Sequence, residues 1–121
     1  MTDLKDKMAK GQALVARLFA GRTTSPTRIP SKFAEYTVGY LFGDVWQGDD
    51  LTLQQRSMIT CTTLVALNRT AEQQVHFLGA KNLGIPRSEI EGMIIHVAHY
   101  AGWPCAMSAF HVLNEVWPQP A

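Results

Sequence analysis

The chain has 121 residues, 46% of them hydrophobic and 17% charged, with a formal net charge of +1. This length fits a single domain, residues 1–121, and dispersed basic residues argue against a nucleic-acid surface. No segment approaches the roughly 18 consecutive apolar residues of a membrane-spanning helix, and we expect no signal peptide. We therefore expect a soluble, cytoplasmic protein, and the low share of charge favours an apolar face that another subunit covers.

The N-terminal part of the chain predicts one helix and then an irregular segment. Apolar residues recur at mostly helical spacing over residues 3–20 and stop at Gly21. The sequence GRTTSPTRIP, residues 21–30, follows and combines Gly, two Pro and four hydroxyl residues. Such a composition breaks regular structure, so we treat residues 1–30 as a divergent N-terminal helix and loop.

A second helix is predicted from Ser31, as its N-cap, through Trp46. Gly39 and Gly43 lie inside it, and each costs about 1 kcal/mol relative to Ala in a helix. Their presence indicates that another part of the backbone packs closely there. The sequence QGDD then predicts a turn.

The third helix, residues 53–67, is predicted from a capping box and a long apolar stretch. Thr52 and Gln55 have the spacing at which a hydroxyl and an amide each bind a free backbone N–H. The pattern that follows is apolar nearly all round. A helix of this kind is buried by its neighbours or by a partner chain.

Three further helices complete an all-α fold of about six helices. Thr70 and Gln73 predict a second capping box, opening a helix over residues 70–81. Pro86 suits the first turn of a helix over residues 86–101, and Pro104 begins the last one, which ends near residue 117. No strand-like alternation competes with these helices.

Glu72 and His76 stand four residues apart, so their side chains share one helix face. A carboxylate in this position can fix an imidazole tautomer and raise its basicity. An ordinary solvated surface pair has the same spacing, so the spacing alone leaves both readings open.

His96 lies between strongly apolar residues, with His99 three positions later. Two histidines at this spacing can ligate a metal, but no HExxH pattern and no acidic or Cys ligand accompanies them, so we predict no metal site. A hydrogen-bonded core histidine is the ordinary reading of His96. A buried imidazole with charged partners is also how acid–base groups are tuned.

Three other residues interrupt apolar surroundings. Arg56, early in the third helix, needs an anionic partner, either a protein carboxylate or a substrate. Cys61 and Cys105 are predicted to be reduced, buried thiols rather than a disulfide. Cys105 next to a helix N-terminus could be reactive, but a structural role is the commoner one.

The stretch from Phe33 to Trp117 resembles the carboxymuconolactone decarboxylases and their relatives in the alkyl-hydroperoxidase-D-like superfamily. The resemblance combines an Arg in the third helix, an ExxxH pair, an NxG turn and an H-x-A-x-Y-A-G-x-P signature. The segments that carry it are GDVW, LTLQQRSMITCTTLVALNRTAEQQVHFLGAKNLGIPRSEI and IIHVAHYAGWPCAMSAFH.

The resemblance implies a helical protomer that assembles into a ring-like trimer or hexamer, with active sites near subunit contacts. It also implies chemistry without a metal or an organic cofactor, on a small-molecule carboxylate or lactone from aromatic catabolism. In the decarboxylase a carboxylated butenolide loses carbon dioxide, so the site must stabilise an enolate-like oxyanion and then protonate carbon.

Carried over by residue, the resemblance makes His76 the acid–base group, oriented by Glu72. His96 would then donate to the oxyanion or relay a proton. The substrate-binding residues would include Arg56, which anchors a carboxylate of the substrate or of the protein, and His111, for which packing is an equally good reading. Trp46, Tyr100 and Trp103 would wall the pocket.

The sequence departs from the family pattern in two places. The segment LFAGRTTSPTRIP lacks the His and Asp that such decarboxylases commonly have there, so the substrate can differ. The CxxC pair of the peroxidase branch is absent, which disfavours a thiol peroxidase. Two alternatives to a lyase stay open: an isomerase or other proton-transfer enzyme on another small acid, and a non-catalytic oligomeric binding protein.

Overall fold

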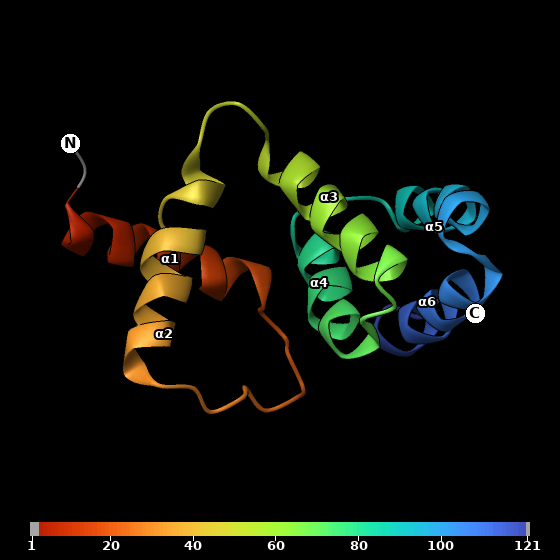
Figure 1. Cartoon of the computed structure of the whole chain (residues 1–121), viewed down its shortest axis with the longest axis horizontal. Coiled ribbons are helices and arrows are strands. Elements are labelled where there is room, and N and C mark those ends of the chain that lie inside the picture. The colour runs from red at the N-terminus through yellow and green to blue at the C-terminus, as the bar shows by residue number, and fades with distance from the viewer. Residues whose placement is uncertain (1–2, 121) are drawn as a thin grey trace.

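The computed structural model describes residues 3–120, and within them every regular element is helical, as the sequence predicts. Six α-helices follow one another along the chain (Figure 1). They are α1 (Leu4–Leu18), α2 (Ser31–Glu35), α3 (Leu53–Ala66), α4 (Thr70–Asn82), α5 (Arg87–Ala101) and α6 (Trp103–Val116), with a π-helix over Tyr36–Phe42 and a 3₁₀ helix over Val45–Gln47 between α2 and α3. None of these helices is long and apolar enough to cross a membrane.

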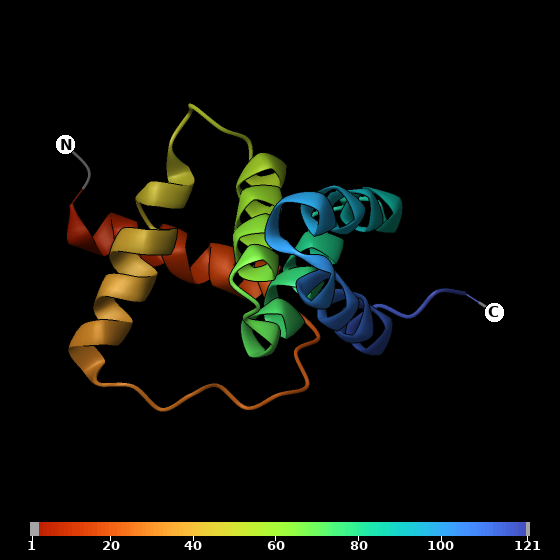
Figure 2. The same cartoon turned by 45° about the vertical axis from the view of Figure 1, so that its right-hand side comes forward.

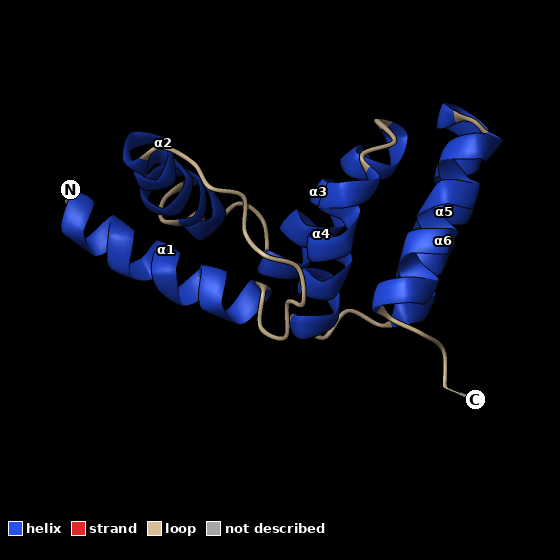
Figure 3. Cartoon of the chain, turned by 90° about the horizontal axis from the view of Figure 1, so that it is seen from below, coloured by secondary structure: helices blue, strands red, loops and turns tan. Residues whose placement is uncertain are grey.

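The larger hydrophobic core lies among α3, α4, α5 and α6. Its fully buried side chains come from all four helices and include Cys61, Phe77, Ile90, Ile94 and Leu113. Helices α3 and α4 occupy the middle of the molecule, while α5 and α6 pair at one end (Figures 1 and 3). In this single chain only one face of α3 is buried. Ile59, which also lies on α3, is exposed.

A second, smaller core lies between α1 and the π-helical segment. Leu14 and Leu18 of α1 pack there with Phe42, Trp46 and Leu83. The predicted regular helix over residues 31–46 is wrong in its detail, because only its first turn is α-helical and the next seven residues form a π-helix.

Glycines allow α1 and the π-helix to approach closely. A Cβ added to Gly11 would overlap the carbonyl oxygen of Val38, and one added to Gly43 would overlap that of Lys7. A Cβ on Gly39 would lie 2.8 Å from the sulfur of Met8. The close backbone packing predicted at Gly43 is therefore confirmed, whereas Gly39 approaches the flexible side chain of Met8 instead of backbone.

Asn82, at the end of α4, joins the two cores. Its side-chain amide donates to the carbonyl oxygens of Leu18, at 2.8 Å, and Ala20, at 2.9 Å. The end of α1 is thereby fixed against α4, and the exposed segment 21–30 leaves from this point and runs below α4 to α2 (Figure 2).

Of the helix caps predicted at Ser31, Thr52 and Thr70, only the one at Thr52 is formed. The Thr52–Gln55 capping box is present, with both hydrogen bonds formed. The Thr70–Gln73 box is wrong: α4 has no side-chain cap, and the Gln73 amide is buried and donates to the Leu64 carbonyl at 3.1 Å. Ser31 is likewise the first helical residue rather than a cap. Gln73 faces α3, so its side chain cannot also return to Thr70.

Candidate functional site

His76 lies on the side of α4 that meets the end of α1. Its ring is partly buried and packs edge to face on Phe19, with 5.6 Å between the centroids. Burial lowers the pKa of His76 because the imidazolium loses hydration. The negative charge of Glu72 opposes this shift, and the positive charge of Arg22 adds to it. The net effect favours a neutral imidazole at pH 7.

Glu72 shares the helix face of His76, as the spacing predicts, but its hydrogen-bonding partner is Arg69. The Arg69 guanidinium donates to the Glu72 carboxylate at 2.7 Å. This hydrogen bond is the main reason why the pKa of Glu72 is lowered. Within residues 3–120 no hydrogen bond joins Glu72 to His76, so Glu72 acts on the imidazole through its charge. That charge raises the pKa of His76, as the spacing predicts, but burial outweighs it.

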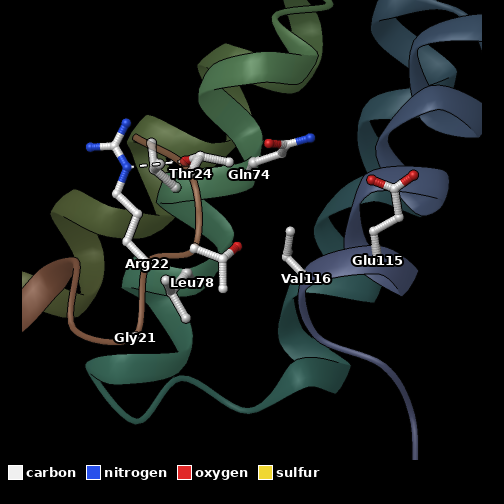
Figure 4. A pocket seen from close by; sticks show the side chains of 9 residues that line it. Gly21, Arg22, Thr24, Gln74, Leu78, Glu115 and Val116 are labelled. Atoms are coloured by element: carbon white, nitrogen blue, oxygen red, sulfur yellow. Dashed lines mark hydrogen bonds between the residues drawn. The ribbon is translucent and has the colours of Figure 1, made fainter. Parts of the chain in front are cut away.

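A cavity of about 160 Å³ opens between segment 21–24, α4 and the end of α6, and its lining on α4 is Gln74, Val75 and Leu78 rather than His76. Arg22 and Thr24 line one side of it and Glu115 the other, with Gln74 and Leu78 of α4 between them (Figure 4). Arg22 Nε donates to Thr24 Oγ1 at 3.1 Å. The Arg22 side chain extends to the far side of Thr24 from Glu115, so its guanidinium turns away from the cavity (Figure 4).

His111 lies on α6 beside the neighbouring hollow. Its Nε2 is 2.9 Å from a carboxylate oxygen of Glu115, and its side chain is exposed, so the packing reading of His111 is wrong. Gln74 and Glu115 line this second hollow as well as the first. The two hollows therefore lie side by side along α4 and α6.

Arg56 has the protein carboxylate that was one of its two predicted partners. Its guanidinium donates to Asp50 at 2.6 Å and to the Gly48 carbonyl at 3.4 Å, and the side chain is largely buried. These contacts join α3 to the turn that precedes it.

His96 and the aromatic residues predicted as pocket walls lie elsewhere. His96 is exposed on α5, where its ring stacks on that of Tyr100 with 5.0 Å between centroids. The reading of His96 as a core histidine is therefore wrong for the single chain. Tyr100 is 82% exposed and Trp103 60% exposed, whereas Trp46 is buried against Phe42. Helices α3 and α4 stand between α1 and α5 (Figure 1), so one chain does not bring His96 to the side where His76 meets Phe19.

Both cysteines are free, as predicted. Cys61 is fully buried and its thiol donates to the His76 carbonyl at 3.4 Å; burial raises the pKa of this thiol to about 12. Cys105 is only partly buried. In the part of the chain that the structure describes, no three His, Cys, Asp or Glu side chains gather as a metal site would require.

The sequence reading missed Phe19, Arg22 and Arg69. Phe19 and Arg22 belong to a region that looks like a helix end and an irregular loop, and only the fold brings them to α4. Arg69 precedes Glu72 by three residues, a spacing that favours an ion pair and could have been noticed.

The fold and the site define a small all-helical domain with a partly buried histidine on α4 that packs against the end of α1. The model of the carboxymuconolactone decarboxylase family matches residues 31–115, and the chain belongs to this family. It is similar to the 4-carboxymuconolactone decarboxylase of Acinetobacter baylyi, with 32% identity over 85 residues, 70% of this chain and 63% of that protein. It is also similar to the nitrosuccinic acid decarboxylase of Metarhizium robertsii, with 31% identity over 94 residues, 78% of this chain and 64% of that protein. The matches thus span a little under two thirds of either relative.

Proposed function

We propose that this protein is a decarboxylase that acts on 4-carboxymuconolactone or a related carboxylated lactone or unsaturated acid, without a cofactor. The single observation that carries the proposal is the partly buried His76, which packs on Phe19 and shares a helix face with Glu72, in a chain of this family. The names of both similar proteins support the reaction type.

The reaction needs a place for charge and a source of a proton. As the bond to the departing carboxylate breaks, its electron pair moves through the unsaturated ring to the lactone carbonyl oxygen, and carbon dioxide leaves. The oxyanion then collapses as a proton is added to carbon. A hydrogen-bond donor at the oxygen and an acid at the carbon are therefore required.

His76 is the residue best suited to the proton transfer. The imidazole of His76 would take up one net proton from the bulk solvent and pass it to carbon, which returns the ring to its neutral form. The lowered pKa makes the imidazolium a readier donor. Glu72 stabilises the imidazolium through its charge. His96 would supply the hydrogen bond to the oxyanion, as the family resemblance implies.

An assembly of copies would complete the site. Ile95, Tyr100, Trp103 and Met107 expose apolar surface on α5 and α6, next to His96. A second copy that covers this face would bury His96, which the single chain leaves in solvent. Light scattering of the purified protein tests the assembly, and Tyr100→Glu is expected to shift it to smaller species.

The direct test of the activity is release of carbon dioxide from 4-carboxymuconolactone by the purified protein. His76→Ala and His96→Ala are expected to lower kcat by at least about 100-fold, the usual contribution of a general acid or base. His99→Ala is the matched control, because His99 is exposed on α5 and has no assigned role.

Each variant is compared only after its assembly state matches that of the parent. Full turnover in both His76→Ala and His96→Ala would exclude the histidine mechanism. No turnover by the parent would move the function to another small acid, to an isomerase-like proton transfer, or to binding without turnover.

A further inference from the structure

We propose that Arg69 is a positioning residue for His76: its guanidinium holds the Glu72 carboxylate at the N-terminal end of α4 and so prevents a hydrogen bond between Glu72 and the imidazole. This inference rests on the proposed function, because it concerns the acid–base group of that reaction. Arg69 acts on the reaction only through Glu72.

The first support is that the fold fixes the backbone of Arg69. Its N–H donates to the Leu64 carbonyl at 2.8 Å, and its own carbonyl accepts from the Gln73 N–H at 3.0 Å. Asn68, just before it, has a φ of 56°, a left-handed conformation that Asn tolerates better than most residues. The side chain of Arg69 therefore leaves the backbone from a fixed point directly before the first turn of α4.

The second support is the contact between the two side chains. Arg69 Nη2 donates to Glu72 Oε1 at 2.7 Å, which is a short, charge-assisted hydrogen bond. The Glu72 carboxylate lies in the first turn of α4, where the helix dipole favours negative charge and no side chain caps the helix. Both side chains are partly exposed, and such pairs add little to stability. The main effect of the pair is therefore on the direction of the carboxylate.

The third support is that Arg69 and His76 lie on opposite sides of Glu72 along the chain. Glu72 follows Arg69 by three residues and precedes His76 by four, and side chains at both spacings are neighbours on a helix. At about 1.5 Å per residue, the seven residues from Arg69 to His76 span roughly 10 Å along the axis. A carboxylate that is drawn to Arg69 is therefore drawn away from the imidazole.

The charged groups around His76 leave Glu72 as the carboxylate that can raise its basicity. Burial lowers the pKa of His76 most, the Glu72 charge raises it and the Arg22 charge lowers it. From α3, the Cys61 thiol reaches the backbone carbonyl of His76 and stays neutral, because burial raises its pKa to about 12. From the end of α1, the uncharged Phe19 covers the ring.

The position of this carboxylate determines how good an acid His76 can be. A hydrogen bond to a carboxylate stabilises the imidazolium, which raises the pKa of a histidine and makes the imidazolium a weaker acid. In the proposed reaction the imidazolium must give its proton to carbon. With its carboxylate held at Arg69, Glu72 still attracts the proton through its charge, but the imidazolium remains a ready donor.

Arg69→Gln is expected to raise the pKa of His76, because the Glu72 carboxylate becomes free to hydrogen-bond to the ring. An NMR titration of the His76 ring signals in the intact assembled protein measures this change. Arg69→Lys is expected to restore part of the parent behaviour, since an ammonium can also pair with Glu72. Lys81→Gln is the matched control, because it removes a positive charge from the exposed last turn of the same helix. It is expected to leave the pKa of His76 close to that of the parent.

A double variant separates positioning from a direct effect of charge. Loss of the positive charge of Arg69 would by itself raise the pKa of His76, whatever Glu72 does. Arg69→Gln is therefore also made in the Glu72→Gln protein. If Arg69 acts through Glu72, the second substitution adds no further rise to the pKa of His76. A rise as large as in the Arg69→Gln single variant, or an unchanged pKa in that single variant, would overturn the proposal.

Turnover supplies a second readout. In Arg69→Gln the alkaline limb of the pH profile of kcat/KM for 4-carboxymuconolactone is expected to move to higher pH, by the same amount as the His76 pKa, with KM little changed. A large rise in KM with an unchanged His76 pKa would make Arg69 a substrate-binding residue and contradict the proposal. Absence of turnover by the parent would contradict the proposed function alone, because the NMR titrations still decide whether Arg69 positions Glu72.

Discussion

The rings of Phe19 and His76 meet edge to face, with 5.6 Å between their centroids and 87° between their planes. Phe19 follows the last residue of α1, and His76 lies in the middle of α4. The contact covers the imidazole and removes part of its hydration, which disfavours the charged form. The end of α1 thus acts directly on the titration of the proposed catalytic group.

Phe19→Ala is expected to raise the pKa of His76 toward its ordinary value, because water regains access to the ring. An NMR titration of the His76 ring protons measures the change. Phe33→Ala is the control, since Phe33 is exposed on α2. Equal His76 pKa values in the two variants would show that Phe19 does not control hydration of the imidazole.

Glu72→Gln is expected to lower the pKa of His76 further. The Glu72 charge favours the imidazolium, so its removal leaves burial and the Arg22 charge unopposed. The same NMR titration is used, with Glu89→Gln on the exposed first turn of α5 as the control. A His76 pKa that rises in Glu72→Gln would contradict the electrostatic role assigned to Glu72.

The stability of the fold is expected to depend on pH through His76. The folded chain binds the proton of His76 less readily than the unfolded chain, because the folded-state pKa lies below 6.5. The free energy of unfolding therefore decreases as pH falls from 6.5 toward the folded-state pKa. Urea denaturation across this window should show a shallower decrease for His76→Gln, and parallel curves would refute the linkage.

Gly11→Ala is expected to destabilise the fold by about 1–3 kcal/mol, because the new methyl group would overlap the Val38 carbonyl and push α1 from the π-helix. Gly92→Ala is the control, and its expected effect on stability has the opposite sign. Nothing lies within 4 Å of a Cβ at Gly92, so the substitution should stabilise α5 by about 0.5–1 kcal/mol. Urea midpoints compare the two, and a neutral Gly11→Ala would disprove the close approach.

The two cysteines are expected to differ in reactivity. Cys61 is fully buried with a pKa raised to about 12, so iodoacetamide near neutral pH should leave it unmodified in the folded protein. Cys105 is partly accessible and should be alkylated first. Mass spectrometry after partial labelling locates the modification, and urea-unfolded protein should be labelled at both. Early labelling of Cys61 would mean that the core around α3 opens readily.

Much of the fold could be predicted because its signals are local. The Thr52–Gln55 box lies within one turn of helix, and the breaks at Gly21 and Gly102 reflect positive φ values that glycine adopts without strain. The Thr70–Gln73 box has the same local pattern, but Gln73 is recruited by α3 instead. Sequence spacing cannot show which of two hydrogen-bonding partners a buried amide will have.

The candidate site could be predicted only on α4. The spacing of Glu72 and His76 sets their shared face, whatever surrounds the helix. Their actual partners, Arg69 and Phe19, depend on a neighbouring turn and on a helix about 60 residues earlier. For His96 the sequence predicts the wrong environment. Its apolar neighbours indicate a buried side chain, but His96 is exposed in the single chain.

The hydrogen bonds from Asn82 separate the part of the chain that the helical core holds from the part that it does not. They hold the backbone just after α1 at Leu18 and Ala20, and beyond Gly21 the segment to Pro30 is exposed. The entropy of closing such a loop grows slowly with its length, by about 0.6 kcal/mol for each doubling. The residues after Arg22 can therefore be lengthened or exchanged at little cost to the helical core, while the helix that carries His76 stays unchanged.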